Sequence, residues 1–301
     1  MSAPRPILVV GKSGQLARSL VDAAARRGIP LIALGRPDLD LRDPGSIDRA
    51  VGVTQLHAIV NAAAYTAVDK AESEASSAFA INRDGAARLA QAAAAAGLPF
   101  VHISTDYVFD GRKPSPYRED DPTAPLSVYG RSKRESEIVV QQACSWAHIL
   151  RTSWVYSPYG QNFVKTMLKN AQERSVVQVV DDQHGAPTAA ADIADAILQI
   201  LMRPQPRSDA GLYHLAASGE TSWHGFAEAI FASLTRRGWR TPELRRVAAA
   251  DYPYLAQRPA NSRLDCSKIA RALGIHMPDW RSSLETCLHA LSASPSENTQ
   301  C

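Results

Sequence analysis

The sequence predicts an α/β fold: a Rossmann-like, doubly wound parallel sheet with a smaller α+β substrate domain on its C-terminal side. Between residues 7 and 156, short apolar segments alternate with longer amphipathic ones, the order expected for strands and helices of a parallel sheet. A turn containing Gly11 and Gly14 joins the first apolar segment to the first amphipathic one. Such turns bring a helix N-terminus close to a pyrophosphate. Beyond about Ser157 the alternation ends, and Tyr, Trp, Pro and Arg become more frequent.

Each segment is expected to form one element. The first half predicts strands at "ILVV" (7–10), "PLIAL" (30–34), "AIVNAA" (58–63), "PFVHIST" (99–105) and "AHILRTSWVY" (147–156). It predicts helices at "QLARSLVDAAARRG" (15–28), "RDGAARLAQAAAAAG" (83–97) and "RSKRESEIVVQQA" (131–143). In the second half, "NFVKTMLKNAQE" (162–173) and "ADIADAILQILM" (191–202) are expected to be helical, and "SVVQVVDD" (175–182) and "GLYHLAA" (211–217) to be strands.

These expectations divide the chain into two domains. Residues 1–156 are assigned to a NAD(P)-binding domain, with a returning segment near 185–215. Residues 157–184 and 216–290 are assigned to a substrate-binding cap. The remaining segment, 291–301, is small and polar, and is expected to be disordered.

Composition argues against several classes of partner. A formal net charge of +3 without any block of Lys and Arg does not favour nucleic acid. The cysteines lack C-x-x-C spacing, so neither a zinc site nor a disulfide framework is expected. The N-terminal residues do not resemble a signal peptide, and no apolar run is long enough to span a bilayer. We therefore expect a cytoplasmic protein that does not interact with membranes.

The stretch "SVYGRSKRE" places Tyr129 four residues before Lys133, on the same face of a predicted helix. A free phenol has a pKa of about 10 and exchanges its proton poorly at neutral pH. A nearby ammonium that lowered this pKa by about three units would contribute about 4 kcal/mol of differential stabilisation. The pair is therefore a candidate acid/base device. Because this spacing also arises by chance, the interpretation depends on the surrounding sequence.

The segments expected to bind a nucleotide are part of that surrounding sequence. "VVGKSGQLARSL" has the spacing G-x-x-G-x-x-A, with Ala17 where a third glycine often stands. An acidic residue at the end of the second strand would favour NAD, whereas here the strand ends in Gly35 and Arg36. A guanidinium suits the 2′-phosphate of NADP, so NADPH is the expected cofactor, with NADH as the alternative. A solvent-facing arginine at a strand end would explain Arg36 equally simply.

Together with "STDYVFDG", which places Thr105 at the end of the fourth predicted strand, these motifs resemble the extended short-chain dehydrogenase/reductase superfamily. The resemblance is closest to the dTDP-4-dehydrorhamnose reductase family. It rests on blocks such as "VNAAAYTAVDKAE", "RTSWVYSPYGQNFVKTML", "DDQHGAPT" and "RPANSRLD", spread from about residue 7 to 280.

The resemblance implies residue roles that agree with the chemistry of carbonyl reduction. Tyr129 would be the general acid, Lys133 would lower its pKa and bind the nicotinamide ribose, and Thr105 would bind the reacting oxygen. Asn82 would support the site through its backbone or a water molecule. The implied cofactor-binding residues are Gly11, Gly14, Gln15, Leu16, Arg36, Asp40, Leu41, Ala62, Ala64, Tyr65, Thr66, Tyr129 and Lys133. The implied substrate-binding residues are Thr105, Asp106, Tyr129, Trp154, Asn162 and Arg258.

Some interpretations remain open at this stage. Trp154 is equally compatible with the core, and Arg258 with a surface ion pair. His102, His184 and His214 lack metal-ligand spacing, and no metal is expected. The expected reaction is NADPH-dependent reduction of dTDP-4-dehydro-β-L-rhamnose to dTDP-β-L-rhamnose, with the 3,5-epimerase as functional neighbour and a monomer or homodimer as the assembly. The alternatives are another nucleotide-sugar reductase or epimerase and a non-catalytic NADP-binding regulatory subunit.

Overall fold

A computed structural model describes residues 4–52, 55–253 and 255–293. Its centre is a six-stranded parallel sheet in the order β10-β5-β4-β3-β1-β2. The strands are β1 (Ile7–Val10), β2 (Leu31–Leu34), β3 (Ala58–Asn61), β4 (Phe100–Thr105), β5 (Ala147–Thr152) and β10 (Gly211–His214). The expected parallel α/β architecture is therefore confirmed.

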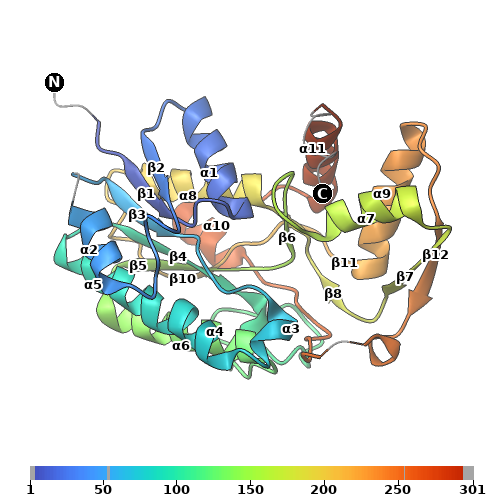
Figure 1. Cartoon of the computed structure of the whole chain (residues 1–301), viewed down its shortest axis with the longest axis horizontal. Coiled ribbons are helices and arrows are strands. Elements are labelled where there is room, and N and C mark those ends of the chain that lie inside the picture. Colours follow the sequence, from blue (N-terminus) through green and yellow to red (C-terminus); the bar gives the residue numbers. More distant parts are fainter. Residues whose placement is uncertain (1–3, 53–54, 254, 294–301) are drawn as a thin grey trace.

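Helices cover both faces of this sheet (Figure 1). One face carries α1 (Gln15–Arg26), α8 (Ala190–Leu201) and α10 (Ser267–Leu273), whose apolar side chains join Ile7, Val9 and Val60 in one buried cluster. The opposite face carries α2 (Pro44–Gly52), α5 (Ala86–Ala95) and α6 (Val128–Ala143), packed against Leu8, Val10 and Ile59. Successive residues of β1 thus alternate between the two layers, as a strand buried on both faces requires.

Between β3 and β4, the chain passes through short α3 (Val68–Ala71) and α4 (Ala75–Phe79). A π-helical segment, Ala80–Gly85, then runs directly into α5. The predicted helix at 83–97 is therefore present and is preceded by helical turns that sequence periodicity did not indicate. Helix α2 was also not predicted, because it begins with Pro-Gly and carries only a short apolar pattern.

A second cluster of buried residues lies beyond the sheet, at the right in Figure 1. It is formed by α7 (Phe163–Glu173), β7 (Val176–Val180), α9 (Trp223–Arg236), β12 (Glu243–Val247) and α11 (Trp280–Ala293). Short ribbons connect it to the sheet: β6 (Val155–Tyr156) pairs with β9 (Thr188–Ala189), and β8 (His184–Gly185) with β11 (Thr221–Ser222).

Three expectations need correction. The predicted strand 147–156 is two strands, because the chain turns at Trp154, whose φ is 51°. The range 216–290 does not belong wholly to the second cluster, since Ile269 and Leu273 of α10 pack with α1 and α8. The first residues of the predicted tail, 291–293, continue α11, and 294–301 lie outside the described residues. The division into a nucleotide-binding domain and a cap otherwise stays a prediction.

His148 on β5 offers a test of this packing. The side chain is fully buried, and burial lowers the pKa of His148 to about 4. Between pH 6.5 and 4 the unfolded chain binds a proton there that the folded protein does not, so stability falls as the pH is lowered through this window. We expect His148→Phe to reduce the loss of unfolding free energy between pH 7 and pH 4.5 by about 2 kcal/mol. Urea denaturation at both pH values measures it; an unchanged pH dependence would contradict the assignment.

Candidate active site

The start of α6 is fixed by two side chains. Ser127 accepts a hydrogen bond from the amide of Gly130 (3.1 Å), the usual N-cap arrangement. Glu72, just after α3, accepts another from the amide of Val128 (2.8 Å). Because both bonds are made in the first turn, they determine where Tyr129 projects from the helix.

Gly130 brings this turn unusually close to the segment that follows β4. A Cβ atom at Gly130 would lie 2.3 Å from the carbonyl oxygen of Tyr107 and 3.0 Å from Cβ of Pro125. Glycine is the least favourable residue in a helix interior apart from proline. Its presence between Tyr129 and Lys133 is explained by this close approach.

Tyr129 lies against Thr105 and Asp106 at the carboxyl end of β4. Burial raises the pKa of Tyr129 to about 12; a hydrogen bond with Thr105 opposes the rise, and the Asp106 carboxylate adds to it. Thr105 also donates to Oδ1 of Asp106 (3.0 Å), and burial raises the pKa of Asp106 to about 6. At neutral pH the phenol therefore holds its proton, the state that a general acid requires.

Lys133 is directed toward β4. Its Nζ donates to the carbonyl oxygen of Ile103 (2.6 Å) and lies 3.3 Å from Nε2 of His102. Burial lowers the pKa of Lys133 to about 8, and the carboxylate of Glu137 opposes this effect. The groups that shift the Tyr129 pKa are thus Thr105 and Asp106 together with burial, and the expected lowering by Lys133 stays a prediction.

Asn82 connects the loop after β3 to α6. Its Oδ1 accepts from the amide of Tyr65 (2.7 Å), while Nδ2 donates to the Tyr65 carbonyl (3.1 Å) and to Oγ of Ser132 (2.9 Å). Ser132 donates in turn to the carbonyl of Tyr129 (2.7 Å). The Asn82 side chain thus links this loop to α6, and its expected support of the site through its backbone or a water molecule stays a prediction.

His102, a buried residue of β4, contacts α6 on the side that faces the sheet. Nδ1 of His102 lies 3.1 Å from Nδ2 of Asn61, and its Nε2 lies 3.0 Å from Oγ of Ser136. Because Asn61 donates at Nδ1, we assign the ring proton to Nε2, which donates to Ser136. Burial and the charge of Lys133 hold the pKa of His102 well below its ordinary value.

Arg151 on β5 and Glu137 on α6 form a buried, bidentate ion pair. Nε and Nη2 of Arg151 each lie 2.8 Å from a Glu137 oxygen, and both side chains are 2% exposed. Ser104 donates to the same carboxylate (2.5 Å). Nε2 of His214 lies 3.5 Å from Arg151 and its Nδ1 lies 3.1 Å from the Tyr117 carbonyl, so the neutral imidazole bridges arginine and backbone.

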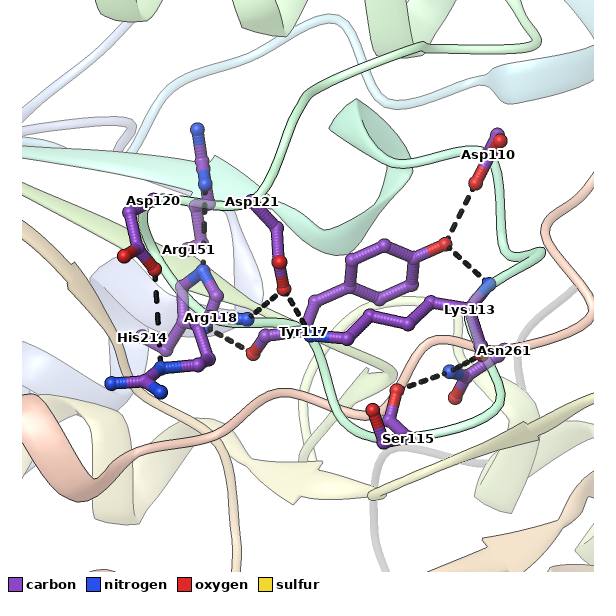
Figure 2. A network of polar contacts seen from close by, with 10 residues as sticks. All are labelled: Asp110, Lys113, Ser115, Tyr117, Arg118, Asp120, Asp121, Arg151, His214 and Asn261. Atoms are coloured by element: carbon purple, nitrogen blue, oxygen red, sulfur yellow. Dashed lines mark hydrogen bonds and ion pairs between the residues drawn. The ribbon is translucent and has the colours of Figure 1, made fainter.

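Figure 2 shows how Arg151 and His214 lie next to the segment that follows β4. The Tyr117 hydroxyl donates to Asp110 (2.7 Å), and Asp121 accepts from Lys113 and from the amide of Arg118. Nδ2 of Asn261 donates to the carbonyl of Lys113 (2.6 Å). Residues 110–121 are thereby held between β10 and the "RPANSRLD" segment.

The turn between β1 and α1 has the shape that a dinucleotide needs. Gly11 has φ 120°, in the region that favours glycine, and a Cβ there would lie 3.0 Å from the Ala62 backbone. Gly14 is the N-cap of α1, and a Cβ there would lie 3.8 Å from the carbonyl oxygen of Gly11, an ordinary contact distance. Its position leaves the helix N-terminus accessible to a phosphate, so these residues fit a bound pyrophosphate.

The neighbouring predicted cofactor residues occupy different environments. Arg36 is exposed just after β2, next to the place expected for a 2′-phosphate. Lys12 of the glycine turn approaches Gly35 closely, and its ammonium lies 3.6 Å from a carboxylate oxygen of Asp38. Asp40 is paired with Arg42, whose hydrogen bonds lower the Asp40 pKa to about 2. The other members lie nearby: Leu16 and Leu41 have buried side chains, Ala62, Ala64 and Tyr65 are half-buried, and Thr66 is exposed.

Two predicted substrate residues are engaged by the protein itself. Asn162 is the N-cap of α7, where its Oδ1 accepts from Lys165 (3.1 Å) and its Nδ2 donates to Oε1 of Gln15 (2.9 Å). Arg258 donates to Oδ2 of Asp69 (2.8 Å), an ion pair that ties the segment before "PANSRLD" to α3. Their roles in substrate binding stay predictions.

Sequence reasoning missed several supporting residues. Glu72, Glu137 and Arg151 gave no local signal, because their partners lie far away in the chain. Ser132 and Ser136 lie one turn apart on the buried side of α6, a polar pattern that a helix packed on a sheet rarely shows. Within the described residues there is no group of three or more His, Cys, Asp or Glu side chains that could hold a metal ion. In the same part of the chain, no helix is both long and apolar enough to cross a membrane.

Comparisons with known proteins decide the family. The family model described as "RmlD substrate binding domain" matches residues 5–293. A dTDP-4-dehydrorhamnose reductase of Sinorhizobium fredii is 49% identical over 288 residues, covering 95% of this chain and 97% of the relative. The chain belongs to the dTDP-4-dehydrorhamnose reductase family.

Solved structures agree with this assignment. The dTDP-4-dehydrorhamnose reductase of Bacillus anthracis, solved in complex with NADP, superposes with a TM-score of 0.90 at 33% identity and covers 96% of this chain and 100% of its own. The Bordetella bronchiseptica enzyme WbmG, in complex with NAD and UDP, has a TM-score of 0.80, covering 97% and 96%, at 18% identity. This second likeness extends the fold, but not the function, beyond the reductase family.

The buried ion pair yields a stability prediction. Arg151→Met leaves the Glu137 carboxylate buried without its main partner, which we expect to lower the unfolding free energy by about 3–5 kcal/mol. The double variant Arg151→Met/Glu137→Met removes both charges and should regain most of that loss. Urea unfolding of the two variants measures the difference. A double variant no more stable than the single one would show that the charges themselves are not the cause.

Gly130 yields a second prediction. Gly130→Ala should favour the helix locally but force the first turn of α6 away from the Tyr107 carbonyl, with a net destabilisation of about 1–3 kcal/mol and a loss of turnover. Gly52→Ala is the matched control, because a Cβ at Gly52 meets nothing within 4 Å. Thermal unfolding and initial rates for both variants test this expectation, which fails if Gly130→Ala behaves like the control.

Proposed function

We propose that this protein reduces dTDP-4-dehydro-β-L-rhamnose to dTDP-β-L-rhamnose with NADPH, the last step of dTDP-L-rhamnose biosynthesis. Membership of the reductase family over nearly the whole chain supports the reaction, and the NADP complex of the Bacillus anthracis relative supports the cofactor. The observation that carries the chemistry is the hydrogen bond between the Tyr129 phenol and Thr105 at the carboxyl end of β4.

In this proposal each residue has one task. NADPH, when bound, supplies a hydride to the carbonyl carbon at C4. Tyr129 donates its proton to the carbonyl oxygen as negative charge develops there, so that a secondary alcohol is formed. Thr105 orients the phenol and supports the oxygen, and Asp106 borders the same pocket. Lys133 supplies positive charge next to the nicotinamide ribose.

The glycine turn and Arg36 would hold the cofactor. Gly11 and Gly14 allow the pyrophosphate to approach the backbone, and Gln15 is the first residue of α1, next to the expected pyrophosphate. Arg36 would pair with the 2′-phosphate and favour NADPH over NADH. The proposed setting is the cytoplasm, with the 3,5-epimerase as the preceding enzyme and a monomer or homodimer as the active assembly.

The test of the reaction is NADPH oxidation in the presence of dTDP-4-dehydro-6-deoxy-D-glucose and a 3,5-epimerase. Oxidation that requires the epimerase supports the proposed substrate, and parallel assays with NADH establish the cofactor preference. NADPH binding without oxidation would favour another sugar nucleotide or the regulatory-subunit interpretation.

Tyr129→Phe is the decisive variant. It removes the proton donor but keeps the ring, so we expect kcat to fall by about 10²–10⁴-fold while the Kd for NADPH stays nearly constant. Tyr107→Phe is the matched control, since the Tyr107 ring meets that of Tyr129 edge-on, with centroids 5.6 Å apart. Stopped-flow reduction and NADPH fluorescence titration measure the two quantities. Undiminished turnover in Tyr129→Phe would refute the role.

A further inference from the structure

Trp154 stands at the edge of the sheet that carries the catalytic groups. In the parallel pairing of β4 and β5, Thr152 lies beside Thr105, and Trp154 follows two residues later. Its backbone adopts φ 51°, a left-handed conformation that is unfavourable for a bulky side chain. A backbone held in such a conformation indicates that the surrounding structure determines it.

Both faces of the Trp154 indole are covered by the protein. Trp223 stacks on one face, with ring centroids 3.7 Å apart and an angle of 11° between the planes. A Cβ at Gly185 would lie 2.7 Å from Cε2, 2.9 Å from Cζ2 and 3.0 Å from Nε1 of Trp154. A point nearer to Cε2 than to both of its bonded neighbours lies above the ring plane and not beyond its edge. The indole is therefore sandwiched between Gly185 and Trp223.

This arrangement changes how Trp154 can meet a sugar. With both faces covered, the ring cannot lie flat along a ligand, and only its edge is available. The side chain is partly exposed, so such an edge contact is open to it.

The two covering residues are joined to each other. Gly185 lies in β8, which pairs with β11 (Thr221–Ser222), and Trp223 follows β11 directly as the first residue of α9. On its other side Trp223 contacts Phe163 of α7, with ring centroids 4.8 Å apart. The sandwich thus inserts a side chain from the end of the catalytic sheet into the second cluster of the fold.

We propose that Trp223 and Gly185 are positioning residues that hold the edge of Trp154 toward the sugar of the sugar nucleotide. The inference rests on the proposed function, because it takes the reacting sugar to lie beside Thr105. The stack with Trp223 and the absence of a side chain at Gly185 together stabilise the left-handed backbone of Trp154. The sandwich then acts on recognition of the sugar and not on the nucleoside diphosphate or the cofactor.

Two ligands distinguish an effect on recognition of the sugar from an effect on recognition of the nucleoside diphosphate. Calorimetric titrations of the NADP⁺-loaded enzyme would use dTDP-β-L-rhamnose and, as a probe lacking the sugar, dTDP. We expect Trp223→Leu to raise the Kd for dTDP-β-L-rhamnose by about tenfold and the Kd for dTDP by less than about twofold. The Kd for NADP⁺ should stay the same. In turnover, KM for the sugar substrate should rise more than kcat falls.

Other variants distinguish positioning from a general loss of packing. Trp223→Phe keeps an aromatic face and should restore most of the affinity for dTDP-β-L-rhamnose. Phe163→Leu perturbs the same cluster without touching Trp154, and should leave the ratio of the two Kd values unchanged. Gly185→Ala adds a methyl group against the indole and should reproduce the effect of Trp223→Leu. The double variant should be little worse than either single one, because both changes release the same ring.

Each outcome has a defined meaning. Equal weakening of dTDP and dTDP-β-L-rhamnose, or no weakening of either in folded Trp223→Leu and Gly185→Ala, would overturn the proposal. If the Phe163→Leu control alters the ratio as strongly, the effect is one of packing and the proposal also fails. A wild-type enzyme that binds neither ligand and oxidises no NADPH would instead refute the proposed function.

Discussion

The buried ion pair between Arg151 and Glu137 is the constraint on which the rest of the site depends. It joins α6, which carries Tyr129 and Lys133, to β5, which leads directly to Trp154. Burying two charges is costly unless their geometry and remaining hydrogen bonds are satisfied. Here the bidentate contact, the Ser104 hydroxyl and the nearby His214 supply those partners. Because the pair is stable in only one arrangement, it fixes the register of the helix on the sheet.

The other polar contacts of α6 also restrict its orientation. Ser132 and Ser136 face the sheet side, where Asn82 and His102 meet them. An apolar interface would tolerate small rotations of the helix, whereas a network of satisfied polar groups specifies one orientation. Glu72 and Ser127 add the same precision at the helix N-terminus. The phenol of Tyr129 is therefore oriented by contacts on several sides before any ligand is considered.

Periodicity predicted the parallel sheet well, because strands buried on both faces give short apolar runs that do not depend on distant residues. It failed at "AHILRTSWVY", where Trp154 and Val155 are good strand formers and yet the chain turns between two strands. At that turn the Trp154 ring contacts Gly185 and Trp223, which lie far along the chain and give no local signal. The helix α10 was placed with the cap for a similar reason: its amphipathic pattern indicates that one face is buried, but not against which layer.

The candidate site was likewise predicted from the sequence only in part. Sequence motifs identified Tyr129, Lys133 and Thr105, but spacing alone suggested that the lysine governs the phenol. In the structure, burial and Asp106 raise the Tyr129 pKa, and Lys133 donates to the Ile103 carbonyl. A protonated phenol is the state from which a proton can be donated in a reduction. An alkoxide forming at the substrate is a far stronger base than a phenolate, so even a phenol with a raised pKa gives up its proton favourably. A phenol is already protonated at neutral pH, and the raised pKa keeps the proton on Tyr129 until negative charge develops on the carbonyl oxygen.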